Sequence, residues 1–185
     1  MDKNAVDQGV LVCFGNSITE GWMVAPHESW PALIGQSVPM RVINAGISGE
    51  TSADGLGRID TILSLQPSSC IVEFGINDFF NGFSVDQTRA NLEQIINTFQ
   101  RNGVSPGLMG FSLPQYNTRP WEETYAQVAR AFDIPLLTDL FQGLRGKTGT
   151  FMPDGVHPTA KGYEIIAHNC INAFQGKLWK PPATS

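Results

Sequence analysis

The chain has 185 residues, 42% of them hydrophobic, and its 12 basic and 17 acidic side chains give a formal net charge of −5. This length and composition allow one domain with a sizeable core. No long run of either charge occurs, which argues against nucleic acid or an acidic membrane surface as the main partner.

The chain opens without the basic, apolar and small-residue segments of a secretory leader, and no apolar run is long enough to span a bilayer. As given, it is expected to be soluble and cytoplasmic, without stable membrane anchoring. A leader removed beforehand would leave no trace, so periplasmic export stays open as an alternative. The sequence does not determine an oligomeric state.

The first half of the chain alternates strand-like apolar runs with helical patterns. The run that begins at Val10 is typical of a buried strand and stops at Gly15. Ser29 and Pro31 are an N-cap and a helix start. We therefore expect a strand at 10–14, a helix from 30 to about 38, a strand at 41–45 and a helix over roughly 52–65.

The second half continues the alternation. A strand is expected at 70–74, and Ser84 with Gln87 forms a capping-box pattern that opens a helix ending at Gly103. The remaining elements are a strand at 106–113, a helix bearing the stripe Tyr125, Val128, Ala129 and Phe132, an edge strand at 134–137, and a helix over 163–174.

Strands and helices alternate five times without a break in composition. This pattern predicts one doubly wound α/β domain with a parallel sheet over residues 1–185, with 1–8 and 177–185 as loose termini. The three cysteines, Cys13, Cys70 and Cys170, fall at core-like positions, which favours reduced thiols over disulfides or a metal site.

Polar turns follow the first three strands: Gly15-Asn16-Ser17, the segment 46–51, and Gly75-Ile76-Asn77-Asp78. Carboxyl ends of parallel strands share one edge of a sheet, so these turns are expected to converge on one crevice. A fourth segment, Asp154-Gly155-Val156-His157-Pro158, precedes the last helix. Taken singly, each segment is more commonly a helix cap or a surface turn.

Acyl transfer needs the residue types found in these turns. A serine hydroxyl requires a base, usually histidine, and the histidine requires an acid to hold its other ring nitrogen. Ser17, His157 and Asp154 are the candidates, with base and acid in one short loop. For the oxyanion, Gly49 suits a backbone donor and Asn77 a side-chain donor.

The four segments, in this order and on these elements, resemble the SGNH (GDSL) hydrolase family over nearly the whole chain, and 44–52 and 151–158 match best. The likeness is nearest to the branch of bacterial thioesterase I, lysophospholipase and arylesterase enzymes. It implies a three-layer, flavodoxin-like domain whose five-stranded parallel sheet is flanked by helices. It also implies no metal and no cofactor, with an acyl-enzyme on Ser17 and the acid at Asp154.

The resemblance predicts a serine esterase acting on small-molecule carboxylic esters and acyl thioesters. The backbone amides of Ser17 and Gly49, with the Asn77 side chain, would bind the oxyanion. Candidates for the acyl pocket are Phe79 and Phe80, which follow Asn77, together with Leu113 and Pro114; Trp22 and Met23 are candidates for its other wall. Packing of these aromatic side chains in the core is an equal alternative.

One position departs from the family pattern: Asn16 stands where Asp is usual. Asparagine lacks the charge and adds N–H donors. The alternative function is therefore a weakened or non-catalytic relative that binds acyl esters or carbohydrates.

Two other classes lack their motifs. His27, His157 and His168 show no metal-ligand spacing, and His168 lies off the apolar stripe of its helix, as a solvated residue would. No phosphate-binding glycine motif follows the first strand, which argues against a nucleotide-binding module.

Overall fold

Five parallel strands form the centre of the computed structural model, which describes residues 9–180. The sheet order is β2-β1-β3-β4-β5, and every neighbouring pair is parallel. The strands are β1 (Val10–Gly15), β2 (Arg41–Gly46), β3 (Ser69–Glu73), β4 (Ser105–Met109) and β5 (Leu136–Leu137). The predicted five-stranded parallel sheet of a single α/β domain is thereby confirmed.

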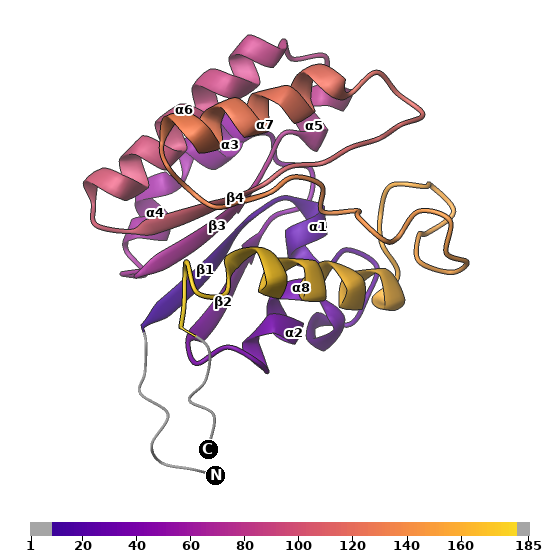
Figure 1. Ribbon diagram of the computed structural model, residues 1–185, viewed down its shortest axis with the longest axis horizontal. Helices are drawn as coiled ribbons and strands as arrows, with labels where there is room; N and C mark the ends of the chain where they lie inside the picture. The colour runs from indigo at the N-terminus through magenta and orange to yellow at the C-terminus, as the bar shows by residue number, and fades with distance from the viewer. Residues whose placement is uncertain (1–8, 181–185) are drawn as a thin grey trace.

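Helices cover both faces of the sheet, which gives the three predicted layers. Figure 1 shows α3 to α7 on one face and α2 with α8 on the other. The helices are α1 (Ser17–Glu20), α2 (Trp30–Gly35), α3 (Ser52–Gly57), α4 (Ile59–Leu63), α5 (Ile76–Phe80), α6 (Val85–Arg101), α7 (Arg119–Ala131) and α8 (Ala160–Phe174), with a short 3-10 helix at Pro26–Glu28.

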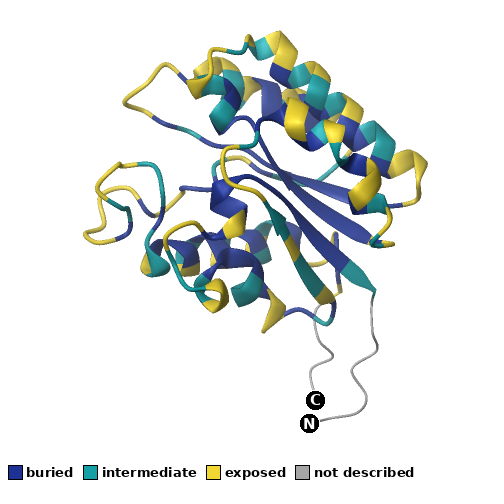
Figure 2. Ribbon diagram, turned by 180° about the vertical axis from the view of Figure 1, so that it is seen from behind, coloured by how far each residue is buried: buried dark blue, intermediate teal, exposed yellow. Residues whose placement is uncertain are grey.

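The central strands are apolar along their length because both of their faces are covered. Residues 11–14 of β1 and 70–72 of β3 have no exposed surface, and Figure 2 shows both strands in dark blue. Cys13, Cys70 and Cys170 are free and buried in this core, as predicted. Burial raises the pKa of each thiol, which keeps it protonated.

The long helices follow their sequence signals. Ser84 and Gln87 form the predicted reciprocal capping box at the start of α6. In α8 the predicted stripe is buried on the sheet, while His168 is exposed, because helical periodicity places it on the outer side.

The helix predicted over 52–65 is two helices, α3 and α4, separated at Arg58. Gly55 and Gly57 weaken the helix before this point. The Arg58 guanidinium turns inward and donates to the Ala45 carbonyl at 2.8 Å, near the carboxyl end of β2. A tertiary contact therefore decides where the first helix ends.

Two further elements are shorter than predicted. The strand expected at 106–113 ends at Met109, which is also the last residue of β4 in register with β5. The helix expected to reach about Val38 ends at Gly35, where tight turns continue the chain toward β2. The edge position predicted for the fifth strand is confirmed, although only two residues of 134–137 pair.

The prediction of a loose tail from 177 is wrong for the residues up to 180. Leu178 and Trp179 are buried, and the Ser69 hydroxyl donates to the Leu178 carbonyl at 3.0 Å. This segment covers the amino end of β3, where two large apolar side chains gain more from burial than the chain loses in freedom. Residues 1–8 and 181–185, also predicted to be loose, lie outside the described residues.

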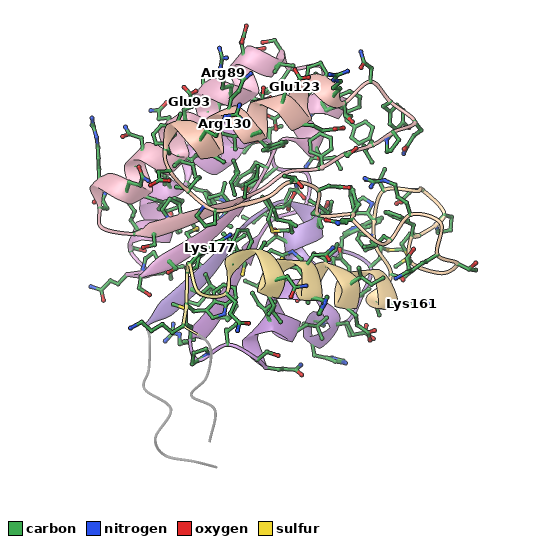
Figure 3. The ribbon with its side chains drawn as sticks, viewed as in Figure 1. Arg89, Glu93, Glu123, Arg130, Lys161 and Lys177 are labelled. Atoms are coloured by element: carbon green, nitrogen blue, oxygen red, sulfur yellow. The ribbon has the colours of Figure 1, made fainter. Side chains whose placement is uncertain are left out.

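Charged side chains line the outer surfaces of the helices. Figure 3 shows Arg89 and Glu93 on α6, and Glu123 and Arg130 on α7, pointing away from the sheet. Arg89 pairs with Glu93 and Arg119 with Glu123, and exposed ion pairs of this kind contribute little to stability. Within residues 9–180, no helix has the length and apolar character needed to cross a membrane.

Candidate active site

The register of the sheet brings the polar turns together. Gly15 at the end of β1 lies opposite Gly46 of β2 on one side and opposite Glu73 of β3 on the other. The segments that follow these three residues therefore leave the sheet at one edge, as predicted from the strand order.

Ser17, His157 and Asp154 form one hydrogen-bonded line. Ser17 Oγ lies 2.9 Å from His157 Nε2, and His157 Nδ1 lies 2.8 Å from Asp154 Oδ2. Ser17 begins α1, whereas His157 and Asp154 lie in the loop before α8. The structure thus brings Ser17 together with His157 and Asp154, although Ser17 and His157 are 140 positions apart in the sequence.

The acid is held by its own loop. Asp154 Oδ1 accepts hydrogen bonds from the backbone amides of Val156 at 2.8 Å and His157 at 2.9 Å. Burial acts to raise the pKa of Asp154, but these amides and the His157 ring outweigh it, so the pKa lies below its usual value. Asp154 is therefore ionised at neutral pH and orients His157.

The backbone amides of Ser17 and Gly49 have no hydrogen-bond partner among the described residues. The Ser17 amide belongs to the first turn of α1, where helical geometry provides no acceptor. Gly49 has a φ of 84°, and no protein atom lies within 4 Å of the position its Cβ would take. The left-handed backbone thus requires glycine here, and the space beside it is open.

Asn77 completes this donor set from the start of α5. Its side-chain Nδ2 donates to the Glu50 carbonyl at 2.8 Å, which leaves a second N–H on the same nitrogen. The adjacent Asp78 is fully buried and accepts from the backbone amide of Ser52 at 2.8 Å and from its hydroxyl. Asp78 thereby ties α5 to α3 and fixes the direction of Asn77.

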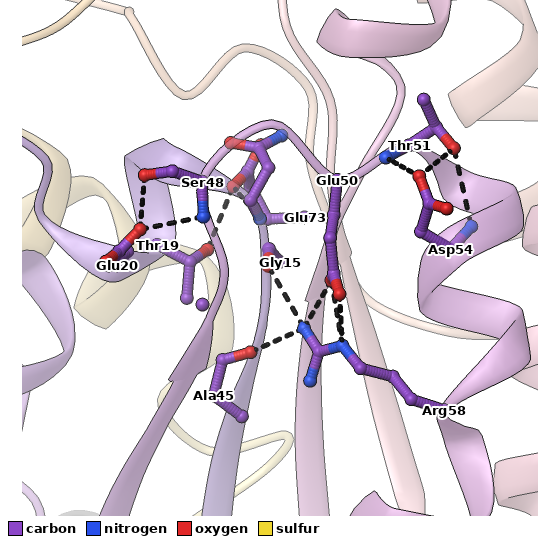
Figure 4. A network of polar contacts seen from close by, with 12 residues as sticks. Gly15, Thr19, Glu20, Ala45, Ser48, Glu50, Thr51, Asp54, Arg58 and Glu73 are labelled. Carbon is purple, nitrogen blue, oxygen red and sulfur yellow. Dashed lines mark hydrogen bonds and ion pairs between the residues drawn. The ribbon is translucent and has the colours of Figure 1, made fainter.

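The loop that carries Gly49 is held from both sides (Figure 4). On one side, the Glu20 carboxylate accepts from the amide and the hydroxyl of Ser48. On the other, Glu50 is paired with Arg58, whose Nε and Nη2 lie 2.8 and 2.6 Å from its carboxylate oxygens. This bracing holds the Gly49 amide in place without a substrate.

A cavity of about 160 Å³ opens beside the serine. Its lining residues are Ser17, Ile18, Ile76, Asn77, Phe80, Asp154, Val156 and His157. Of the side chains predicted for an acyl pocket, Phe80 is in this set. The sequence analysis missed Ile18, Ile76 and Val156, although each is next to a motif residue and that adjacency was the available signal.

The other predicted pocket residues lie elsewhere. Phe79 packs edge-on against Trp121, with ring centroids 5.1 Å apart. Leu113 is buried in the core, and Pro114 is exposed on the following loop. The alternative of core packing therefore describes Phe79 and Leu113: Leu113 belongs to the core and Phe79 packs against it.

The Trp22 side chain packs against the ring of His157. Its ring centroid is 4.4 Å from that of His157, with an angle of 47° between the planes. Trp22 also lines a groove of about 760 Å³ that runs past Met23 and Val24 along the outer edge of β2. His157 thus lines the small cavity and contacts Trp22, which lines the larger groove.

Comparisons with known proteins agree with this geometry. Residues 13–165 match the model of the GDSL-like lipase/acylhydrolase family. Thioesterase 1/protease 1/lysophospholipase L1 of Escherichia coli strain K12 is 34% identical over 164 residues, which cover 85% of this chain and 79% of that protein. Esterase TesA of Pseudomonas aeruginosa is 30% identical over 179 residues, 91% of this chain and 89% of the relative.

The fold agrees as well. A crystal structure of TesA superposes with a TM-score of 0.85 at 28% identity, covering 91% of this chain and 99% of the other. The match to the family model extends from the first strand to the last helix and includes the segments around Ser17 and Asn77. The chain therefore belongs to the GDSL-like lipase/acylhydrolase family and is a hydrolase, as its four motifs predicted.

Proposed function

We propose that the protein is a serine esterase that cleaves small carboxylic esters and acyl thioesters through an acyl-enzyme on Ser17. The observation that carries the proposal is the line from Ser17 Oγ through His157 to Asp154, at 2.9 and 2.8 Å. This arrangement meets the requirements of acyl transfer without any further group.

The reaction follows from the roles of these atoms. His157 Nε2 takes the Ser17 proton as Oγ attacks the acyl carbon, and Asp154 stabilises the imidazolium that forms. The amides of Ser17 and Gly49 and the free N–H of Asn77 donate to the oxyanion. The imidazolium then protonates the leaving group, and water releases the acyl group by the same steps in reverse.

The cavity and the groove suggest where the acyl group and the leaving group of the substrate bind. The acyl group occupies the 160 Å³ cavity, which borders Ser17 and Asn77 and is walled by Ile18 and Phe80. Pockets for drug-sized ligands measure about 300–1,000 Å³, so this cavity suits a short acyl chain. The leaving group departs toward its proton donor His157, where Trp22 opens the 760 Å³ groove.

A rate comparison across p-nitrophenyl esters from acetyl to palmitoyl, with acyl-CoA thioesters alongside, tests the proposal. Wild-type protein should turn over short esters fastest, and Ser17→Ala should neither turn them over nor form an acyl-enzyme. Absence of turnover in the wild type, with an acyl ligand still bound, would favour the alternative of a non-catalytic relative. Equal rates with Ser17→Ala would remove the serine from the reaction.

A further inference from the structure

We propose that Asn16 and Glu73 form a buried amide–carboxylate pair that positions the Ser17 turn, and that the amide at position 16 frees this pair from sharing a proton. The inference rests on the proposed function only in taking Ser17 as the nucleophile. It assigns a role to Glu73 and a reason to the residue that departs from the family pattern.

The contacts of Glu73 all lead to the turn that carries the nucleophile. Its side chain is 2% exposed at the end of β3. The carboxylate accepts from Asn16 Nδ2 at 2.9 Å, from the Thr19 hydroxyl at 2.9 Å and from the Asn16 amide at 3.4 Å. Figure 4 shows Thr19 and Glu73 joined below the loop that bears Ser48. Glu73 thus fixes the residues on both sides of Ser17.

Asn16 connects this carboxylate to α1. Its Oδ1 accepts from the Ile18 amide at 3.0 Å as the N-cap of α1, while its Nδ2 faces Glu73. Each end of the carboxamide therefore meets the partner that its chemistry requires. An aspartate in the same rotamer would keep the N-cap bond but place an oxygen against the Glu73 carboxylate.

The site has no room for a looser arrangement. A Cβ on Gly15, the residue before Asn16, would overlap the Thr19 hydroxyl and lie 2.8 Å from Glu73 Oε2. The side chains are therefore in direct contact, and neither can turn away without moving the turn that bears Ser17.

The electrostatic surroundings of Glu73 determine how the Asn16–Glu73 pair responds to pH. Burial raises the pKa of Glu73 to about 7, while the donors Thr19 and Asn16 act to lower it. The titratable groups that interact with Glu73 are Tyr125 of α7 and Tyr163 and Cys170 of α8, each of which is a neutral acid with a raised pKa. The nearby cation, Arg58, reaches the Gly15 carbonyl at 3.4 Å and is paired with Glu50.

A second carboxyl at position 16 would therefore need a proton. Two carboxyls in contact cannot both ionise in a buried site, so one pKa is strongly raised. With asparagine, ionisation of Glu73 leaves every hydrogen bond of the turn in place, whereas an aspartate pair would lose its shared proton as the pH rises. The nucleophile turn of this chain is thus expected to keep its geometry at alkaline pH.

Four proteins test this, with kcat/KM for a p-nitrophenyl ester measured from about pH 6 to pH 9: wild type, Asn16→Asp, Glu73→Gln and the double variant Asn16→Asp/Glu73→Gln. Asn16→Asp should lose activity relative to wild type by at least about tenfold between pH 7 and pH 9, as its shared proton leaves. Glu73→Gln places two amides in contact and should lower kcat by about 10–100-fold, as displaced nucleophiles do.

The double variant is the decisive protein. It restores one carboxylate and one amide in reversed order, and each hydrogen bond of the turn has a donor and an acceptor again. It should recover to within about threefold to fivefold of wild type and lose the alkaline decline of Asn16→Asp. A role in packing alone would predict additive losses instead.

The matched control is Asn102→Asp, the same chemical change in an exposed side chain after α6. Its pH profile should coincide with that of the wild type. If Asn16→Asp does not fold, a folded and active double variant still supports the pair. A double variant that is unfolded, or no better than Glu73→Gln, overturns the proposal, as does an Asn16→Asp profile identical to wild type.

The proposed function can fail separately. If wild-type protein hydrolyses no ester, the serine esterase is refuted, and the pair is then tested through thermal unfolding over the same pH range. The melting temperature of Asn16→Asp should fall more steeply with rising pH than that of the wild type. The melting temperature of the double variant should fall no more steeply than that of the wild type. Equal slopes in all four proteins would overturn the pair in that case.

Discussion

The Trp22 ring lies against the His157 imidazole, with centroids 4.4 Å apart, while 40% of the tryptophan surface stays exposed. A cation over an aromatic face gains about 0.5–2 kcal/mol. In the proposed reaction His157 carries a positive charge in the transition state, so Trp22→Ala should lower kcat by about 3–30-fold. Trp22→Phe keeps a ring and should lose less. Steady-state kinetics with one aryl ester checks this, and a change confined to KM would contradict it.

Removal of the Asn77 side chain should affect the transition state. Asn77→Ala deletes the side-chain oxyanion donor that we propose and should lower kcat by about 10²–10³-fold with little change in KM, as in other hydrolases. Asn77 also donates to the Glu50 carbonyl, so the melting temperature must be measured beside the kinetics. A kcat within about threefold of wild type in a folded variant would show that the backbone amides suffice.

The two oxygens of Asp154 have separate partners, which allows the acid to be tested by a conservative change. In Asp154→Asn, the remaining oxygen can still accept from the Val156 and His157 amides, but an NH₂ group faces His157 Nδ1. The histidine is then held in the wrong tautomer, and kcat should fall by about 10⁴-fold. Circular dichroism should show an unchanged fold. A loss below about tenfold would mean that Asp154 only shapes its loop.

The wall of the cavity predicts a change in chain-length preference. Phe80 lines the cavity and is 46% exposed, so Phe80→Ala should enlarge the space and shift the optimum toward longer acyl esters. Phe132→Ala is the matched control, because Phe132 packs against the core and does not line the cavity. It should lower the melting temperature and leave the preference unchanged. The same shift in both variants would argue against the assigned acyl site.

The buried Glu73 should make stability depend on pH. Its pKa in the folded protein, about 7, lies above the value of 4.5 that applies when unfolded. The folded state therefore binds the proton more tightly, and its stability falls as the pH rises through this interval, by up to about 3 kcal/mol. Denaturant unfolding of wild type and Glu73→Gln at pH 5 and pH 8 measures the difference. Glu73→Gln should lose most of this slope, and parallel curves would contradict the prediction.

The order of strands and helices was predictable because local patterns record burial. The apolar run before Gly15 and the stripe of α8 name the faces that meet the core, and a capping box marks the start of α6. The candidate residues Ser17, Gly49 and Asn77 follow from the strand ends, which share one edge of a parallel sheet, whereas Asp154 and His157 were assigned from the needs of acyl transfer and the family resemblance. These features depend on neighbours in the chain, and the sequence alone determined them.

The contacts between distant segments were decided by the tertiary structure. Periodicity predicts which face of an element is buried but not what that face packs against. Arg58 divides a predicted helix by reaching the Ala45 carbonyl, and Trp179 of the supposedly loose tail is buried at the far end of the sheet. Phe79 and Phe80 are adjacent in sequence, yet only Phe80 lines the cavity. Asn16 and Glu73 meet across 57 positions, and Ser17 and His157 across 140. Such contacts exist only once the loops between them have closed, which no local pattern encodes.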